Sequence, residues 1–135
     1  GWREVDFIDQ PLVDTSTEDC WQSQLGWFDS RGDMAAAVFI ELYHFNSSEA
    51  ALAGYDSRLT AYSITNVTTV EQVSVGDGGF TVKDSSAVVA EGKTSQMYFV
   101  KGSYVSYIKI NWDDSYDGSY KDVVQIAKIQ AEKLS

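Results

Sequence analysis

The chain has 135 residues, of which 20 are acidic and 10 are basic, so its formal net charge is -10. Hydrophobic residues make up 44% and aromatic residues 13% of the chain, which argues against disorder and is enough for one domain with its own core. The acidic excess repels nucleic-acid phosphates and anionic lipid heads, so neither is expected as a partner. We therefore predict a single domain over residues 1–135. Its expected partners are proteins, either copies of itself or other envelope proteins.

Several features of the sequence favour an exported protein. The chain starts without an initiator Met, and it has no apolar run of the roughly 20 residues that span a bilayer. N-glycosylation tripeptides begin at Asn46 and Asn66, which are candidate glycosylation sites. The single cysteine, Cys20, has no partner for an internal disulfide, so it is either buried or paired with another chain. We predict a secreted or cell-surface location.

The first third of the chain is predicted to hold two strands separated by an irregular segment. Residues 2–8 have strand composition, whereas residues 9–33 are polar and are expected to be irregular, anchored on the body by aromatic side chains such as Trp21 and Trp27. A continuous apolar run that gives way to alternation then predicts a buried strand over residues 34–45.

A helix over residues 47–62 is predicted to follow. Asn46 and Glu49 have the spacing of a capping box, in which each side chain accepts a hydrogen bond from a backbone N–H that the helix leaves unpaired. Apolar side chains then recur at spacings of three and four, which is typical of one stripe of a helix. This stripe consists of Leu52, Tyr55, Leu59 and Tyr62.

Short strands and glycine turns are predicted to fill the next part of the chain. Glycines at 76–79 predict a hairpin turn, residues 87–90 a short strand, and residues 101–103 a second hairpin. The strand over 104–112 has one mostly apolar face and one mixed face, as expected of a sheet covered on one side. A helix over 120–134 closes the chain, with a core stripe of Val123, Ile126, Ala127 and Leu134.

The predicted fold class is α+β, with an antiparallel sheet of five to seven strands and two main helices, over about 47–62 and 120–134, packed on it. The segments FNSSEAA at 45–51, VSVGDGGF at 73–80, FVKGSYV at 99–105 and DVVQIA at 122–127 follow an order that resembles small exported archaeal and bacterial proteins of PsbP-like fold. The resemblance covers roughly residues 34–134. It implies an antiparallel sheet flanked by helices and a non-catalytic accessory or envelope role, and it carries over no functional residue.

No motif in the sequence points to catalysis. His44 is the only histidine, so a Ser-His-Asp triad or a zinc site would depend on it, and a Cys20–His44 pair is the corresponding candidate for thiol chemistry. Neither residue lies in a recognisable catalytic motif. The tripeptide at 31–33, Arg-Gly-Asp, is interpreted as a polar turn before the next strand.

One acidic segment is a candidate calcium site, and calcium is the one cofactor considered. Asp113, Asp117 and Gly118 fit the first half of a calcium-binding loop, but the twelfth position is Val124, where an EF-hand requires a bidentate Glu. The EF-hand interpretation therefore fails. A looser site formed by Asp113, Asp117 and Asp122 is left as the candidate.

Aromatic residues near the end of the chain are the candidate contact surface. Tyrosine and tryptophan are favoured at interfaces because they combine apolar area with a hydrogen-bonding tip. The candidates are Tyr98, Tyr104, Tyr107, Trp112, Tyr116 and Tyr120. We predict a non-enzymatic envelope or surface protein that acts through protein contacts, including self-assembly into a surface layer, sheath or filament. The alternatives are a binding module for a glycan, a solute or calcium, and a secreted hydrolase.

Overall fold

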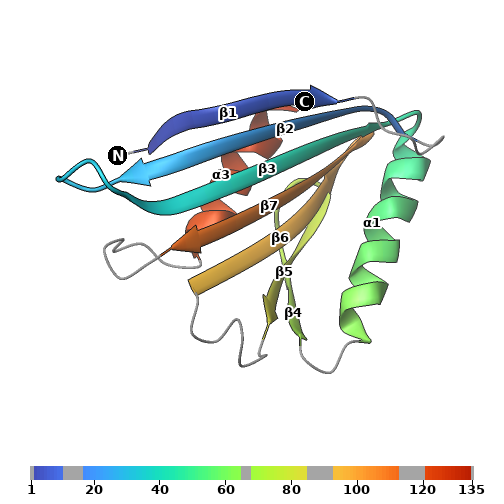
Figure 1. The fold of residues 1–135 in the computed structure, drawn as a ribbon. Helices are drawn as coiled ribbons and strands as arrows, with labels where there is room; N and C mark the ends of the chain where they lie inside the picture. The colour runs from blue at the N-terminus through green and yellow to red at the C-terminus, as the bar shows by residue number, and fades with distance from the viewer. Residues whose placement is uncertain (1, 11–16, 65–67, 85–92, 113–120, 135) are drawn as a thin grey trace.

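The fold is one seven-stranded antiparallel sheet with two helices, in a computed structural model that describes residues 2–10, 17–64, 68–84, 93–112 and 121–134 (Figure 1). The elements are β1 (Trp2–Gln10), β2 (Thr17–Phe28), β3 (Met34–Phe45), α1 (Ser48–Ser63), β4 (Thr68–Val73), β5 (Gly78–Asp84), β6 (Lys93–Lys101), β7 (Tyr104–Trp112) and α3 (Lys121–Lys133). The strand order is β1-β2-β3-β7-β6-β5-β4, because α1 carries the chain from β3 to the far edge of the sheet. The predicted α+β class and both predicted helices are confirmed.

The prediction of an irregular segment over residues 9–33 is wrong, because β2 is a twelve-residue strand paired on both sides. Its side chains alternate: Leu25 and Trp27 lie on one face, and Gln22 and Gln24 lie on the other. Polar residues, amides and a glycine fill the second face, and these residue types have weak strand propensity. Pairing with β1 and β3 overrides that weakness.

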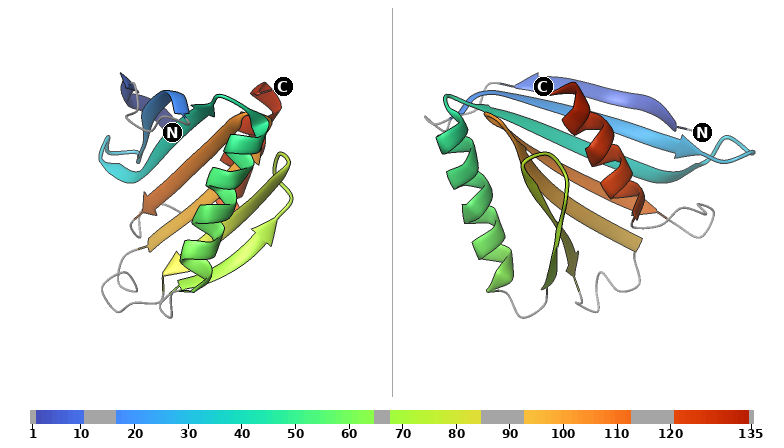
Figure 2. Two further views of the ribbon diagram at one scale, coloured as in Figure 1. Left: turned by 90° about the vertical axis from the view of Figure 1, so that its right-hand side faces the viewer. Right: turned by 180° about the vertical axis from the view of Figure 1, so that it is seen from behind.

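Both faces of the sheet carry a helix, so the prediction of a sheet covered on one side is wrong. In β6, Met97 and Phe99 pack in the cluster under α3, whereas Tyr98 and Val100 pack in the cluster under α1. Helix α3 lies behind the sheet in Figure 1 and in front of it in the right-hand view of Figure 2. Helix α1 covers part of the opposite face, where it contacts β3, β4, β6 and β7 and packs on buried side chains of β5, and the mixed composition of that face reflects this partial cover.

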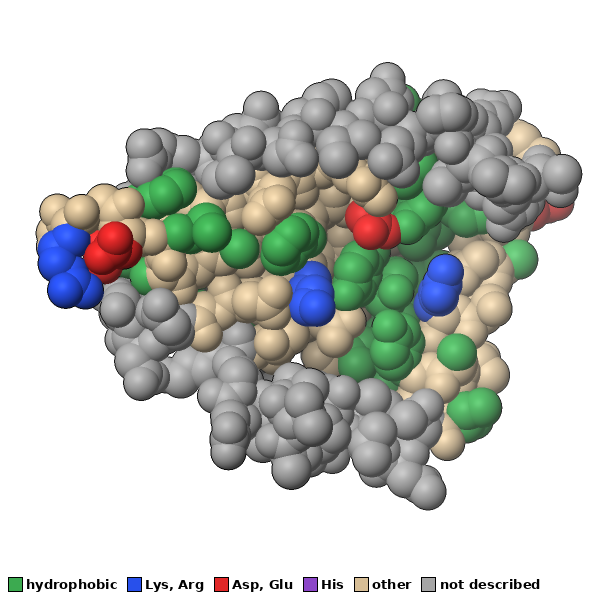
Figure 3. All heavy atoms as spheres, viewed as in Figure 1, with side chains coloured by type: hydrophobic (Ala, Val, Ile, Leu, Met, Phe, Trp, Pro, Cys, Tyr) green, Lys and Arg blue, Asp and Glu red, His purple; other side chains and the backbone are tan. Residues whose placement is uncertain are grey.

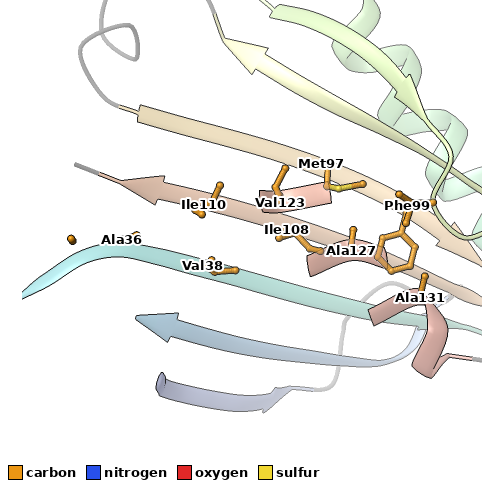
Figure 4. Close-up of a cluster of buried hydrophobic side chains, with 11 residues drawn as sticks. Ala36, Val38, Met97, Phe99, Ile108, Ile110, Val123, Ala127 and Ala131 are labelled. Atoms are coloured by element: carbon orange, nitrogen blue, oxygen red, sulfur yellow. The ribbon is translucent and has the colours of Figure 1, made fainter. Parts of the chain in front are cut away.

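Helix α3 contacts the sheet through small residues at a spacing of four. Val123, Ala127 and Ala131 are buried, and their short side chains let the helix approach the strands closely. Figure 4 shows them facing side chains of β3, β6 and β7, namely Ala36, Val38, Met97, Phe99, Ile108 and Ile110. Val123 and Ala127 were predicted as core residues, whereas Ile126 and Leu134 pack only at the border of the cluster.

Helix α1 starts one residue later than predicted. Ser47, not Asn46, is the N-cap, and its hydroxyl oxygen accepts a hydrogen bond from the backbone N–H of Ala50 at 3.0 Å. Both residue types are good caps, so the sequence does not distinguish them. Gly54 lets the helix lie against Phe45, since a Cβ at position 54 would be 2.9 Å from Cζ of that ring.

The core stripe of α1 is rotated relative to the prediction. Ala51 and Tyr55 are buried, and Leu59 and Tyr62 pack at the edge of the same cluster. Leu52 is 49% exposed, so its assignment to the core is wrong. The spacing of apolar residues fits both a stripe that starts at Leu52 and one that starts at Ala51, and the small side chain of Ala51 gives only a weak signal of burial.

Both predicted hairpin turns are confirmed. Gly76 has φ of 58°, and a Cβ there would be 2.7 Å from the carbonyl oxygen of Val100, so the turn requires glycine. The Asp77 carboxylate accepts a hydrogen bond from the backbone N–H of Gly102 at 2.8 Å, which joins the two turns. The predicted strand at 87–90 lies outside the described residues. Neither α1 nor α3 is long and apolar enough to cross a membrane.

Candidate functional site: the tyrosine face

The candidate site is the part of the sheet that lies beside α1, on the side shown in Figure 3, and its Tyr107 packs at the border of the cluster under α1. There β2, β3, β7 and β6 lie side by side, and alternate residues of each strand point outward. We call this surface the tyrosine face. It consists of ten residues, all partly buried: Gln22, Gln24, Phe39, Glu41, Tyr43, Thr94, Gln96, Tyr107, Lys109 and Asn111.

The tyrosine face is electrically balanced although the protein is strongly acidic. It contains one acid, Glu41, and one base, Lys109, whereas the whole chain carries a net charge of -10. Figure 3 shows few charged side chains among the described atoms on this side. The charges of the described side chains on this face therefore cancel, and a second surface can approach these side chains with little electrostatic cost.

The tyrosines of this face are held by hydrogen bonds and ring contacts. The Tyr107 hydroxyl donates to Oε1 of Gln96 at 2.6 Å, and the Tyr43 hydroxyl donates to the carboxylate of Glu41. The ring of Tyr107 lies 4.7 Å, between centroids, from the ring of the buried Tyr98. These contacts fix the rings in place, so little rotamer entropy is left to lose on binding.

Burial keeps the tyrosine hydroxyls protonated. It raises the pKa of Tyr43, and the hydrogen bond to Glu41 raises that pKa further. Burial also raises the pKa of Tyr107 and, together with a hydrogen bond to Tyr62, the pKa of Tyr98. The hydroxyls therefore act as neutral donors and add no negative charge to the face.

Four side-chain amides of the face have unused hydrogen-bonding capacity within the described part of the chain. Gln96 and Asn111 each accept one bond through the amide oxygen, from Tyr107 and Thr94 respectively, and their NH2 groups make none. The amides of Gln22 and Gln24 also make none there. Each NH2 group carries two donors, so the face presents an array of neutral donors beside aromatic rings.

The six aromatic residues predicted as one contact surface do not share a face. Tyr98 and Tyr107 lie on the side of the tyrosine face, whereas Tyr104 and Trp112 lie on the α3 side. The Tyr104 ring stacks on His44 at 4.6 Å between centroids, and Trp112 packs against the α3 cluster. The alternation of side chains along 104–112 predicts this separation, and the role of these aromatic residues as contacts stays a prediction. Tyr116 and Tyr120 lie outside the described residues.

Phe39 and Tyr43 belong to the site but were missed as contact residues. Both come from β3, which the sequence identifies only as a buried strand. Their alternation within 34–45 was visible, but the pairing that brings Tyr43 opposite Val105 and Phe39 opposite Lys109 is long-range. That pairing is what places β3 side chains beside Tyr107.

The two residues considered for catalysis lie on opposite faces of the sheet. Cys20 pairs with Tyr43 and therefore points to the tyrosine-face side, where it is buried with its thiol 4.0 Å from the carbonyl oxygen of Trp21. His44 is the residue after Tyr43, so it points to the other side. The Cys20–His44 pair is not assembled. Of the two alternatives for Cys20, the structure has the buried one.

The candidate modification and metal residues are only partly described. Asn46 is exposed just before α1, which suits a modified side chain, and Asn66 lies outside the described residues. Asp113 and Asp117 also lie outside them, and Asp122 stands in the first turn of α3. The described residues bring together no group of three or more His, Cys, Asp or Glu side chains that would hold a metal. Calcium binding and glycosylation stay predictions.

Comparison with known proteins identifies a fold and no family. No protein-family model matches the chain, and a search of curated proteins finds no relative. The crystal structure of the extracellular domain of PknH from Mycobacterium tuberculosis is similar, with a TM-score of 0.61 over 98% of this chain and 85% of that one. The two sequences are 8% identical, so the similarity is one of fold alone.

Proposed function

We propose that this chain is a non-catalytic extracytoplasmic protein that acts through protein contacts, and that the tyrosine face is where a second copy of the chain binds. The observation that carries the proposal is a charge-balanced sheet face, rich in tyrosine and amide groups, on a protein of net charge -10. Interface cores are depleted of charge and enriched in tyrosine relative to other surfaces.

Electrostatics support this face as a contact between copies. Two copies of a protein with net charge -10 repel each other, and the repulsion is smallest where the facing surfaces are neutral. A two-fold contact buries the same patch on both copies, so the donors and acceptors of the amides can satisfy each other. Growth into a layer, sheath or filament needs a second surface, for which the edge strands β1 and β4 are candidates.

An extracytoplasmic location is supported by fold similarity and by sequence. The PknH structure that shares the fold is an extracellular domain. The acidic composition and the exposed Asn46 tripeptide agree with the same location.

Sedimentation equilibrium tests the contact between copies. Association is expected to strengthen as salt is added, because salt screens the repulsion between two acidic partners. Gln24→Glu places a new negative charge on each side of the contact. Repulsion between these like charges is expected to weaken association by about tenfold or more, which corresponds to about 1.4 kcal/mol. Gln125→Glu adds the same charge at an exposed position of α3 and is the matched control.

Three results would contradict a contact between copies through the tyrosine face. A monomer at every concentration and salt level would remove the contact between copies. If association with another protein weakens as salt is added, the acidic surface binds a basic partner, and the tyrosine face is not the contact. Equal effects of Gln24→Glu and Gln125→Glu would also exclude the face.

The NH2 groups of Gln96 and Asn111, which make no hydrogen bond in the described part of the chain, favour one second candidate, a neutral glycan. Such a ligand offers hydroxyl groups to the NH2 groups of Gln96 and Asn111 and an apolar sugar face to the ring. Calorimetric titration with neutral oligosaccharides tests this candidate. A glycan site predicts heat of binding that Gln96→Ala abolishes and that does not depend on salt.

A further inference from the structure

A groove lies on the opposite side of the sheet, beside α3. Helix α3 packs over β6 and β7 and leaves part of β2 and β3 beside it uncovered by the helix. The space left there has a volume of about 370 Å³, within the range of small-molecule sites. It is lined by Leu25, Ile40, Ile126, Ile129, Gln130 and Lys133.

Most of the groove is aliphatic. Leu25 and Ile40 come from the sheet, and Ile126 and Ile129 come from the flank of α3. Ile129 is 56% exposed, which is unusual for so large an aliphatic side chain next to a hollow. A ligand with an aliphatic chain would remove this surface from water.

The polar groups of the groove both come from α3. The hydroxyl of the buried Ser106 donates to Oε1 of Gln130 at 2.6 Å, which orients the amide and leaves its NH2 group to donate to a ligand. Lys133 makes no ion pair with any acid in the described part of the chain. A cation and an oriented NH2 group therefore stand beside an aliphatic trough.

We propose that this groove binds a free single-chain aliphatic acid, such as a medium-chain fatty acid. The chain lies against Leu25, Ile40 and Ile129, and the carboxylate meets the ammonium of Lys133 and the NH2 group of Gln130. The positive charge of Lys133 complements the carboxylate of the ligand. The acidic groups elsewhere in the protein repel that carboxylate only weakly, because their charge is screened beyond about 8 Å at physiological ionic strength, whereas Lys133 would contact it directly. Helix α3 rises about 10 Å between Ile126 and Lys133, which suits one extended chain better than a partner helix.

Calorimetric titration with a series of saturated fatty acids below their micelle concentrations tests the proposal. Each added methylene is expected to raise the affinity about fourfold until an extended chain fills the groove, which is about 10 Å long, because burying one CH2 contributes about 0.8 kcal/mol. Lys133→Gln is expected to weaken binding of the acids about tenfold and to leave binding of the matched alcohols unchanged. Lys128→Gln removes the same charge from the exposed side of α3 and is the control.

Several results would overturn the proposal. One is an affinity that does not depend on chain length, and another is an equal loss for acids and alcohols in Lys133→Gln. The third is unchanged binding in Ile129→Glu, which puts an acid at an already exposed position of the groove and is expected to abolish binding with the fold intact by circular dichroism. Binding only to lipid vesicles, or pairing of copies through α3, would show another occupant and also count against it. The proposal does not depend on the tyrosine face.

Discussion

Phe80→Ala is expected to be the most damaging single truncation on the α1 side of the sheet. Phe80 is fully buried, and its ring lies 5.4 Å from Tyr55, 6.3 Å from Tyr62 and 5.2 Å from Tyr98 between centroids. Truncating a buried Phe to Ala costs about 3–5 kcal/mol in total. Because Phe80 loses three aromatic pairs, we expect the upper end of that range, a fall in the free energy of unfolding of about 5 kcal/mol.

Urea denaturation followed by circular dichroism measures this loss, and Leu52→Ala is the matched comparison. Leu52 fits the apolar spacing of the same helix, but it is 49% exposed. Its truncation is expected to cost about 1 kcal/mol or less, since full burial of a Leu contributes only about 1.5–3 kcal/mol. A loss below about 2 kcal/mol for Phe80→Ala, or a larger loss for Leu52→Ala, would refute the packing of α1 on this face.

Three further outcomes follow from the described residues. The thiol of Cys20 is buried, so a thiol reagent is expected to label it slowly in the native protein and rapidly in urea; fast native labelling would show an accessible sulfur. Burial raises the pKa of Tyr43, Tyr98 and Tyr107 in the folded state, while the unfolded value stays near 10. The folded chain therefore holds protons that the unfolded chain releases. Stability is expected to be level below about pH 10 and to fall above it, measured by urea titrations, by less than the full linkage slope because solvent screens these partly exposed groups; a flat profile above pH 10 would exclude burial of these hydroxyls. The Ser95 hydroxyl is buried without a hydrogen-bond partner in the described chain, so Ser95→Ala is expected to stabilise by about 1 kcal/mol in the same assay, and a loss of that size would reveal a hidden partner.

Local sequence patterns predicted the elements whose two faces differ clearly. The run from Met34 to Phe45 and the glycine turns at Gly76 and Gly102 gave β3 and both hairpins at their observed places. Strand β2 was missed because its tyrosine-face side combines Cys20 with amides and a glycine, so its alternation carries little hydrophobic contrast. Its stability comes from neighbours on both sides, which local sequence does not report.

The site was less predictable than the fold because it depends on long-range pairing. The alternation of 104–112 was enough to separate Tyr107 from Tyr104, but it could not place Tyr43 on the neighbouring strand. The groove depends on where α3 crosses the sheet, which the small residues Ala127 and Ala131 decide. The resemblance to PsbP-like proteins stays a prediction.

NMR spectra of the side-chain amides, recorded at increasing protein concentration, test the tyrosine face most directly. Each Gln and Asn NH2 group gives its own signal, so the face carries four reporters, Gln22, Gln24, Gln96 and Asn111, and α3 carries an internal reference in the exposed Gln125. We expect the four signals to shift together as copies associate while that of Gln125 stays in place. Shifts confined to α3 or to the sheet edges, or no shift in any of the four, would contradict a contact through this face.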